Sequence, residues 1–563
     1  MSWTPQVWAK ALLTSHGYKA LLERYSSSNN LDVMYSYPCN LPVLQQALGV
    51  IVHSEHSRIL ANNWYGEHAS KNWQVMPMLQ APSSEISKEN ARRALGLDPD
   101  VFLVCSFGML GPTKLSHRIF DSFILSSLMK DPFTRLIFVG EMDEGDYGQQ
   151  ILHNINQKKL HEKIQITGWT DDDVFRHYLA AADIAIQLRT MSRGETSATV
   201  LDCMNHGLPT VINAHGSLGE LDPEAVWILQ DVFEDDDLAE GMTTLWQDAD
   251  LRRKLGRMAQ TFIRTKHAPD ACAVQYAEII ENIYRNAKQQ SLGLLHHWAE
   301  HPPVGINEAI LAKMLAVNFP PRPRLRQMLI DVSTLVKDDI RTGTQKVTCA
   351  ILLEYLLNPP NGWVVEPVYI ESGFPNYRYA KCFVSRLLGI SDDWATDSSV
   401  DAWDGDIFLG IDLCEHIVPQ HESILSQMRL RGVTIAFIVH DLLPALRPDW
   451  WQTEMSVSIT PRLQTITHVA DGLVCISKTT LDDLVKWLDS EQPQRHQPLR
   501  LGYFYLGSDI ENSSLRMGQA SDFEEILQNL NARPAFLMVG TIEPHKGHAQ
   551  SCLLYTSPSP RDA

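Results

Sequence analysis

Apolar runs typical of buried strands alternate with helical patterns through the middle of the sequence, and this alternation limits the possible folds most. Residues 101–107 (VFLVCSF) form a continuous apolar run, as expected for a strand that is covered on both faces. Strands joined by helices predict a doubly wound parallel sheet, an α/β domain that we place at residues 84–290. The other strands predicted in this domain are residues 136–140, 164–168, 184–188, 210–213 and 225–229.

A second region of the same kind follows a proline-rich stretch. Residues 291–327 lack the alternation and are predicted to be a linker. Residues 328–532 resume it, so we expect another parallel-sheet domain there. Its predicted strands are residues 328–335, 364–370, 407–411, 434–439, 473–476 and 500–505.

The chain also contains a long internal repeat. Residues 47–60 (ALGVIVHSEHSRIL) match residues 470–484 (ADGLVCISKTTLDDL), with Ser54 opposite Ser477. A second match joins residues 102–114 to 536–546 and pairs Gly108 with Gly540 and Lys114 with Lys546. Two ordered matches at nearly equal offset favour tandem duplication over chance similarity between strands.

The repeat assigns an order to the domains. Residues 1–83 are the end of a first domain type, 84–290 are the second type, 328–532 are the first type again, and 533–550 begin the second type again. Residues 551–563 (SCLLYTSPSPRDA) resemble translated sequencing-adapter sequence, and a natural disordered tail is the alternative. We therefore expect an incomplete reading frame, in which neither module has a whole cleft.

Composition excludes several classes of protein. The formal net charge is −19, from 48 Lys+Arg against 67 Asp+Glu, which argues against binding to nucleic-acid backbones. The nine cysteines form no Cys-x-x-Cys pair, so neither a zinc site nor a disulfide framework is expected. The sequence has no signal peptide and no membrane-spanning run, which predicts a soluble, cytoplasmic protein.

The segment 189–207 (RTMSRGETSATVLDCMNHG) is the most informative for chemistry. It follows the predicted strand 184–188 and begins a helix near Thr196 and Ser197, where unpaired N–H groups favour a diphosphate. If helical geometry extends to Glu195, then Glu195 and Asp202 share one face of the helix, about 10 Å apart along its axis. A nucleotide sugar could span that distance. The alternative is that the two residues are a helix-start acid and an ordinary surface aspartate.

The run GETSATVLDCMNHGLPTVIN resembles the donor-site motif of glycosyltransferase family 4, also described as glycosyl transferases group 1. That family has a GT-B fold of two facing Rossmann-like domains, and its motif is two glutamates separated by seven residues. Asp202 takes the place of the second glutamate, whereas Glu195 lies one residue after the first position, as in the Gly-Glu-Thr-Ser variant. The resemblance implies that Glu195 contacts the donor sugar as a catalytic residue and that Asp202 contacts the ribose.

Other residues match the same family. Gly108 and Lys114 match the first strand–loop–helix of the nucleotide domain, where the lysine neutralises the leaving diphosphate, and Lys546 matches it in the second module. Met109 replaces an arginine common in the family, which weakens phosphate binding. Trp169 resembles a residue beside the base, with simple core packing as the alternative.

The second α/β region matches the acceptor domain of the family. Gly343 lies in the segment Arg341-Thr342-Gly343-Thr344, which resembles the glycine-containing loop that closes over the donor. His440 follows the predicted strand 434–439 and resembles the catalytic histidine that faces the donor sugar, although a His-Asp pair there could be only a turn.

The resemblance implies a retaining, metal-independent hexosyltransferase without a cofactor. The tandem layout resembles bacterial mannosyltransferases that make O-antigen (lipopolysaccharide) or capsule, so GDP-mannose is the favoured donor. The acceptor would be a glycan or a lipid-linked glycan. A lipid-linked acceptor would bring the protein into peripheral association with the inner face of the cell membrane. One alternative is an NAD(P)-dependent oxidoreductase, suggested by Gly108-x-x-Gly111 and Glu141. Another is a degenerate glycan-binding or scaffolding module.

Overall fold

A computed structural model describes residues 4–28, 30–83, 86–289, 291–302, 304–320, 322–337, 343–371, 373–450, 453–495, 497–507, 528, 530, 538 and 546–556. The chain divides into two compact units. The six-strand unit comprises Ala11–His16 and Glu23–Leu325, and the seven-strand unit comprises Met1–Lys10, Gly17–Leu22 and Arg326–Ala563. Residues of helix α1 (Pro5–Ser26), which is kinked at Gly17, are divided between the two units.

The six-strand unit is built on a wholly parallel sheet with the strand order β5-β4-β3-β6-β7-β8. This confirms the predicted parallel sheet and all of its predicted strands, with ends that move by a few residues. The strands are β3 (Phe102–Phe107), β4 (Thr134–Val139), β5 (Ile164–Ile166), β6 (Ile184–Ile186), β7 (Thr210–Asn213) and β8 (Trp227–Leu229).

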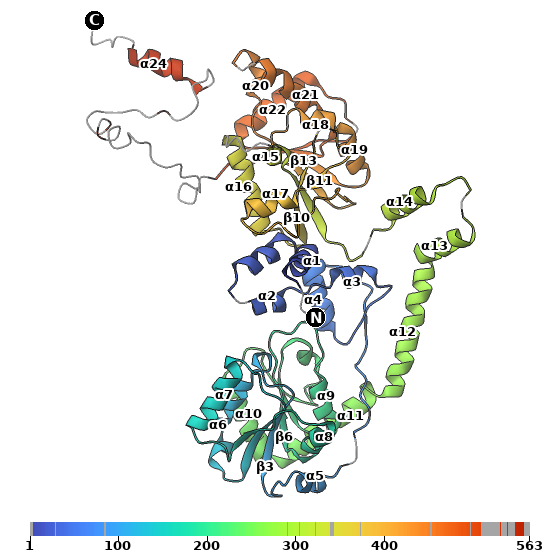
Figure 1. The fold of residues 1–563 in the computed structure, drawn as a ribbon, viewed down its shortest axis with the longest axis vertical. Coiled ribbons are helices and arrows are strands. Elements are labelled where there is room, and N and C mark those ends of the chain that lie inside the picture. Colours follow the sequence, from blue (N-terminus) through green and yellow to red (C-terminus); the bar gives the residue numbers. More distant parts are fainter. Residues whose placement is uncertain are drawn as a thin grey trace. The chain divides into compact units, whose positions relative to one another are not determined.

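Helices cover both faces of this sheet because successive side chains of a strand point to opposite faces (Figure 1). Val104 of β3 packs with helices α6 (Ser116–Leu125), α7 (Asp146–Gln157) and α10 (Asp235–Gln247). Cys105, the next residue, packs on the other face with α5 (Lys88–Ala94), α8 (Asp172–Ala181) and α9 (Ala198–Asn205). Helix α11 (Ala249–Lys266) packs against α9 on that same face.

The strand order places a topological switch point in the middle of the sheet. From β3 the chain proceeds outward to β4 and β5, and it then returns to β6 on the other side of β3. In open parallel sheets, ligands bind outside the carboxyl ends of the strands at such a point. The loops that follow β3 and β6 are therefore the first place to look for a ligand site.

The rest of this unit lies on either side of the sheet domain in sequence. Residues before it form α2 (Asn30–Ser36), α3 (Leu41–Gln46), β1 (Ile51–Val52), α4 (Glu55–Tyr65) and β2 (Gln74–Val75). Residues after it form α12 (Pro269–Gln289), α13 (Ser291–Glu300) and α14 (Glu308–Asn318), so helices occupy part of the range expected to be a linker.

The seven-strand unit has the order β11-β10-β9-β12-β13-β14-β15. Its strands are β9 (Arg326–Asp331), β10 (Trp363–Tyr369), β11 (Arg378–Tyr379), β12 (Ile407–Gly410), β13 (Thr434–Val439), β14 (Gly472–Cys475) and β15 (Arg500–Tyr503). All are parallel except β11, an antiparallel edge strand that the sequence did not predict. The helices of its second half include α19 (Glu422–Leu430), α21 (Thr453–Val469) and α22 (Lys478–Glu491).

One predicted strand of this unit is too long. Residues 328–335 were expected to be extended, but the strand ends at Asp331 and α15 (Ser333–Lys337) follows. The carboxylate of Asp331 accepts hydrogen bonds from the backbone N–H of Ser333 at 3.0 Å and from its hydroxyl at 2.6 Å. A side chain that satisfies the first N–H groups of a turn ends the strand there.

The two copies of the first repeat have the same local structure. In one, β1 is followed by α4 with Ser54 as its N-cap, and in the other β14 is followed by α22 with Ser477 as its N-cap. Each strand then pairs in parallel with the next strand of the chain, β1 with β2 and β14 with β15. Tandem duplication stays a prediction. Most of the second match, including Gly540, lies outside the described residues, and α24 (His548–Thr556) covers the start of the proposed adapter sequence.

Candidate functional site

The loop after β3 brings Gly108 and Lys114 together. Gly108 has a φ of 91°, a conformation that disfavours side chains. A Cβ atom added to it would lie 2.2 Å from the Lys114 ammonium nitrogen. Glycine is therefore required at this position both by the backbone and by the lysine, which lies directly over it.

The Lys114 ammonium is held in a buried place. It donates a hydrogen bond to the carbonyl oxygen of Phe107 at 2.9 Å. Burial, and after it the charge of Arg189, lowers the pKa of Lys114 from 10.5 to about 7. A lysine whose charged form is disfavoured by its surroundings is typical of sites that bind an anion or transfer a proton.

Arg189 follows β6 and is a site residue that the sequence did not single out. Its guanidinium Nη2 donates to the hydroxyl of Ser197 at 2.7 Å and lies 3.4 Å from the hydroxyl of Thr199. Ser197 is the N-cap of α9 and makes no side-chain capping bond. The arginine therefore reaches the start of α9, the helix that was expected to bind a diphosphate. The sequence signal that could have identified Arg189 is its place directly after a predicted strand at the switch point.

Glu195 does not lie on α9. The helix begins at Ala198, and Gly194 has a φ of 99°, so the helical geometry on which the common face with Asp202 depended does not extend to Glu195. The exposed Glu195 carboxylate instead accepts a hydrogen bond from the backbone N–H of Arg193 at 2.7 Å. Glu195 is a loop residue whose position depends on what holds the loop.

A chain of hydrogen bonds holds that loop from the sheet side. The backbone N–H of Ser192 donates to Nε2 of His215 at 3.0 Å, while Nδ1 of His215 lies 2.8 Å from the carboxylate of Asp231. An Nε2 that accepts must be unprotonated, so His215 is neutral with its proton on Nδ1, directed to Asp231. His215 and Asp231 thus position the Glu195 loop.

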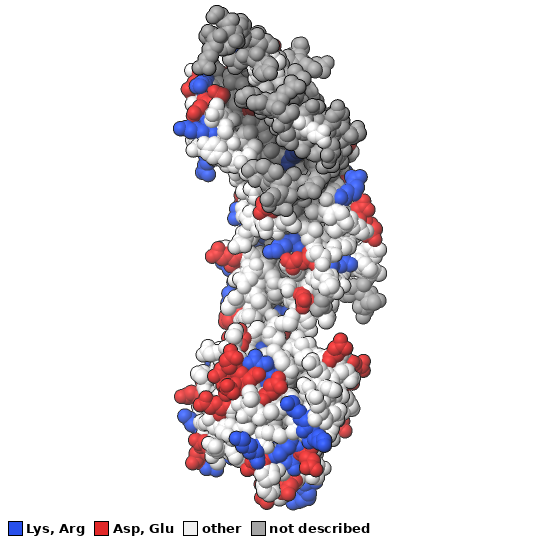
Figure 2. Space-filling view, turned by 90° about the vertical axis from the view of Figure 1, so that its left-hand side faces the viewer, with Lys and Arg blue, Asp and Glu red and all other residues white. Residues whose placement is uncertain are grey.

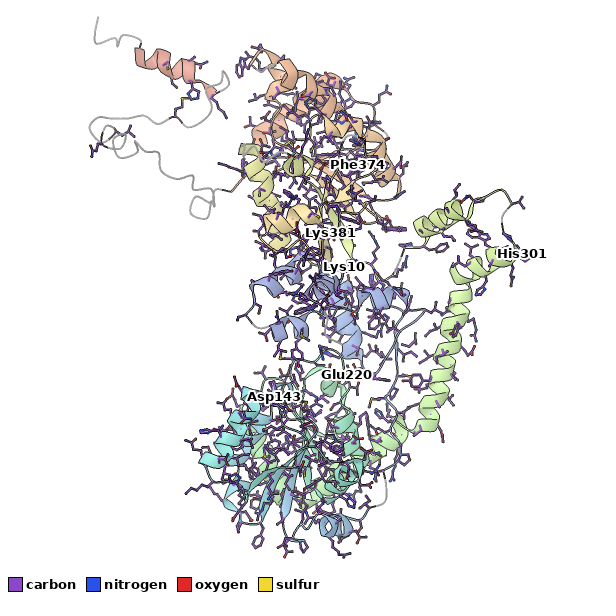
Figure 3. The ribbon with its side chains drawn as sticks, in the orientation of Figure 1. Lys10, Asp143, Glu220, His301, Phe374 and Lys381 are labelled. Carbon is purple, nitrogen blue, oxygen red and sulfur yellow. The ribbon has the colours of Figure 1, made fainter. Side chains whose placement is uncertain are left out.

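Helix α4 holds the same loop from its other side. The Ser57 hydroxyl donates to the carbonyl oxygen of Gly194 at 2.7 Å. The Glu220 carboxylate accepts from the backbone N–H groups of Glu55 at 3.0 Å and His56 at 2.5 Å, which are the first groups of α4. In Figure 3, Glu220 and Asp143 lie at the same end of the six-strand sheet domain, the end of the candidate site.

Asp202 lies on α9, as predicted. Burial raises the pKa of its carboxyl group from 3.8 to about 6. A hydrogen bond with the Gln80 side chain acts in the opposite direction and lowers this pKa. Among the described residues, the buried Thr196 hydroxyl has no hydrogen-bond partner. Thr196, which precedes the N-cap of α9, therefore has a hydroxyl without a partner in the described part of the chain, and Asp202, within the helix, has a carboxyl group with a pKa of about 6.

Trp169 follows β5 and is 76% exposed, so the alternative that it is core is wrong. Its predicted place beside a base stays a prediction. Met109 is also exposed, by 59%.

The candidate residues of the seven-strand unit differ in their local environments. His440 follows β13, is buried, and its Nε2 lies 3.0 Å from the carbonyl oxygen of Ile411. Burial lowers the pKa of His440. Gly343 is the exposed first residue of α16 (Gly343–Leu357), whereas Arg341 and Thr342 lie outside the described residues. Lys546 is exposed, and most of its loop is likewise not described.

Charge, metal ligands and membrane spans were also considered. Basic and acidic side chains are interspersed over the described part of the face drawn in Figure 2. Within the described ranges, no three His, Cys, Asp or Glu side chains are grouped as they would be around a metal ion. Of the helices that the structure describes, none combines the length and hydropathy of a membrane span.

Comparison with known proteins shows what the residues of this site are similar to. Residues 87–262 match the family model described as "Glycosyl transferases group 1". Over 228 residues the chain is 33% identical to the serotype-specific mannosyltransferase WbdA of Escherichia coli, a match that covers 40% of this chain and 28% of the relative. A second WbdA from the same species matches with the same identity and coverage. The chain therefore spans little more than a quarter of the length of the curated relatives that it matches.

Two solved structures are more distant. Sucrose-phosphate synthase from Thermosynechococcus elongatus is 18% identical, over 48% of this chain and 66% of that chain, with a TM-score of 0.39. Anabaena HepE in complex with UDP and glucose is 20% identical, over 47% of this chain and 70% of that chain, with a TM-score of 0.38.

The matched residues 87–262 include Gly108, Lys114, Glu195 and Asp202, the positions on which the resemblance was founded. The oxidoreductase alternative, which depended on Gly108-x-x-Gly111 and Glu141, is not favoured by this match. The resemblance is thereby confirmed for one segment of the chain: residues 87–262 are similar to the group 1 glycosyl transferases.

Proposed function

We propose that this chain belongs to a retaining hexosyltransferase that moves a sugar from a nucleotide-diphosphate donor to a glycan. The observation that carries the proposal is the Lys114 ammonium, which lies over Gly108 at the switch point of the six-strand sheet. An ammonium there would stabilise the negative charge that develops on the diphosphate as the sugar leaves. The family match of residues 87–262 supports the same chemistry.

The remaining site residues would divide the donor between them. Ser197 and the buried Thr196 hydroxyl stand at the start of α9, whose unpaired N–H groups favour a phosphate. Asp202, one turn further along, would accept hydrogen bonds from the ribose, and Glu195 would contact the sugar. His440 and Gly343 would serve the equivalent donor of the second module, together with Lys546.

The favoured sugar is mannose, carried as GDP-mannose, because the curated relatives are named mannosyltransferases. Their description as serotype-specific supports a role in cell-surface polysaccharide synthesis. The acceptor would be a glycan or a lipid-linked glycan, used at the cytoplasmic face of the membrane. The reaction would need neither a metal nor a cofactor.

Nucleotide release from a panel of nucleotide sugars tests this proposal. GDP-mannose should give the fastest release, and Glu195→Ala should reduce it strongly while Glu224→Ala, an exposed glutamate of the same unit, should not. Release that is unaffected by Glu195→Ala would contradict the assigned role. Tight binding of NADH without binding of any nucleotide sugar would contradict the whole proposal.

A degenerate glycan-binding module is the second candidate, because Met109 removes a cation that the family commonly has. In that case the chain would bind oligosaccharides but no nucleotide. If Glu195→Ala leaves the release intact and Lys546→Ala abolishes it, the activity belongs to the second module.

A further inference from the structure

We propose that Arg189 is the second cation of the diphosphate site and takes over the charge that Met109 does not supply. This inference rests on the proposed function, since it concerns how the same site binds the diphosphate of a nucleotide. Met109 is apolar and 59% exposed, so Lys114 is the one cation that the β3 loop itself contributes between Gly108 and α6. A diphosphate carries more charge than one ammonium neutralises.

The strand order brings Arg189 to the same place as Lys114. Strands β3 and β6 are direct neighbours, with Val104 opposite Ile184 and Cys105 opposite Ala185. The loops that follow them are joined by a hydrogen bond from the backbone N–H of Thr190 to the carbonyl oxygen of Thr113 at 2.9 Å. Two cations therefore approach the switch point from two adjacent loops.

The backbone of Arg189 is fixed. Its N–H donates to the side-chain oxygen of Asn213 at 2.8 Å, and its carbonyl oxygen accepts from the side-chain nitrogen of Asn213, also at 2.8 Å. The guanidinium is held as well, because Nη1 donates to the carbonyl oxygen of Leu188 at 3.0 Å and Nη2 donates to Ser197. A guanidinium held in this way is oriented before a ligand arrives, which lowers the entropy cost of binding.

Thr199 links the arginine to the lysine in space. Its hydroxyl lies 3.4 Å from Nη2 of Arg189, and its methyl group lies 3.5 Å from the position of a Cβ on Gly108. The same Cβ position is 2.2 Å from the Lys114 nitrogen. Gly108, Lys114, Arg189 and the first turn of α9 thus lie close together.

The charges of Lys114 and Arg189 are not balanced by the protein. Within the described residues, neither Lys114 nor Arg189 forms an ion pair with a carboxylate. Burial lowers the pKa of Arg189, and Glu195 is the acid that opposes this effect. The charge of Arg189 in turn helps to lower the pKa of Lys114 to about 7. Two partly buried cations without a counter-ion repel each other, and a bound dianion would remove that cost.

The plain alternative is that Arg189 is only structural and tethers the start of α9 through Ser197 and Thr199. The two roles differ in what they predict for ligands. A diphosphate cation acts on ligands in proportion to their phosphate charge, whereas a tether that fails disturbs every ligand of the site alike.

Calorimetric titration of the full chain with GDP and GMP separates the two roles. In Arg189→Met we expect GDP binding to weaken by about tenfold to a hundredfold, and GMP binding to weaken much less, because a charge-assisted contact to the second phosphate is lost. Arg189→Lys should restore part of the GDP affinity, since it keeps the charge without the planar fork. Arg257→Met, at an exposed arginine of α11, should leave both ligands unchanged.

A second readout follows the proton. At pH 8 wild-type Lys114 is mostly neutral, so GDP binding should take up close to one proton, measured from titrations in buffers of different ionisation enthalpy. In Arg189→Met the uptake should decrease, because the pKa of Lys114 rises when the charge of Arg189 is removed, while burial, the larger cause, continues to lower it.

Equal losses for GDP and GMP would overturn the inference, and so would full GDP affinity in Arg189→Met. If Arg189→Met does not fold, judged by alkylation of the buried Cys105 and Cys203, then Arg189→Lys decides through its GDP-to-GMP ratio. If the wild-type chain binds neither GDP nor UDP, the proposed function itself fails, which is a distinguishable result.

Discussion

Replacing Lys114 with methionine should make the six-strand sheet domain more stable while it weakens nucleotide binding. Methionine keeps the length of the side chain and removes the charge. The fall of the Lys114 pKa from 10.5 to about 7 corresponds to at most about 4 kcal/mol of destabilisation at pH 7. Because the lysine keeps some contact with solvent, we expect about half of this value, roughly 2 kcal/mol of increased stability.

The gain should depend on pH with a defined sign. The pKa of Lys114 is lower in the folded state than in the unfolded state, so the lysine destabilises the fold increasingly as the pH falls below 10.5, and this cost levels off once the pH falls below about 7. The advantage of Lys114→Met over the wild type should therefore be larger at pH 6 than at pH 8, by about 1 kcal/mol.

Urea titration with pulsed alkylation of cysteines measures this domain separately from the other unit. Cys105 and Cys203 lie on β3 and α9 and are fully buried, so peptide-resolved mass spectrometry of their labelling reports on unfolding of the six-strand sheet domain. Lys254→Met, at an exposed lysine of α11, is the matched control and should change little. A Lys114→Met chain that is no more stable than the wild type at either pH would refute the view that Lys114 is held at a cost.

Three further predictions concern residues around the same site. Nucleotide affinity should fall below about pH 6 as Asp202 becomes protonated, and calorimetry should show that Asp202→Asn removes this step. His215→Ala should slow nucleotide release about tenfold, with a smaller effect on KM, because Ser192 loses its acceptor and the Glu195 loop shifts; unchanged kcat would contradict this. Gly108→Ala should destabilise the domain by about 1–3 kcal/mol and weaken nucleotide binding, measured by urea titration and calorimetry, because the new methyl group meets the Lys114 ammonium.

The sequence was sufficient for the features that depend on local patterns. The continuous apolar run at 101–107 identified β3, and the small polar residues before Ala198 identified the start of α9 to within about one residue. Gly108 and Lys114 were singled out together because they resemble the first strand–loop–helix of the nucleotide domain of the family. Their common environment is confirmed by the structure.

The features that were missed depend on contacts between distant segments. The Asp231–His215–Ser192 chain joins three loops, and Ser57 reaches Gly194 from a helix that is far away in sequence. No local spacing encodes such contacts. The common face for Glu195 and Asp202 was wrong because Gly194 and Ser197 have non-helical backbone conformations, which the seven-residue spacing could not reveal.

The arginine after β6 lies between these two cases. Its place at the end of a strand is visible in the sequence, but its importance depends on the strand order, which makes β6 the neighbour of β3. Only the tertiary structure shows that the loop of Arg189 meets the loop of Lys114 and the first turn of α9.

The central claim is that Gly108, Lys114 and the start of α9 together bind the diphosphate of a nucleotide. Calorimetric titration of the full chain with GDP and UDP at pH 7, for the wild type and for Lys114→Met, tests it most directly. We predict saturable binding of at least one of the two nucleotides by the wild type, weakened at least about tenfold in the variant. Binding that is equally tight in Lys114→Met, or no binding of either nucleotide by the wild type, would contradict the claim.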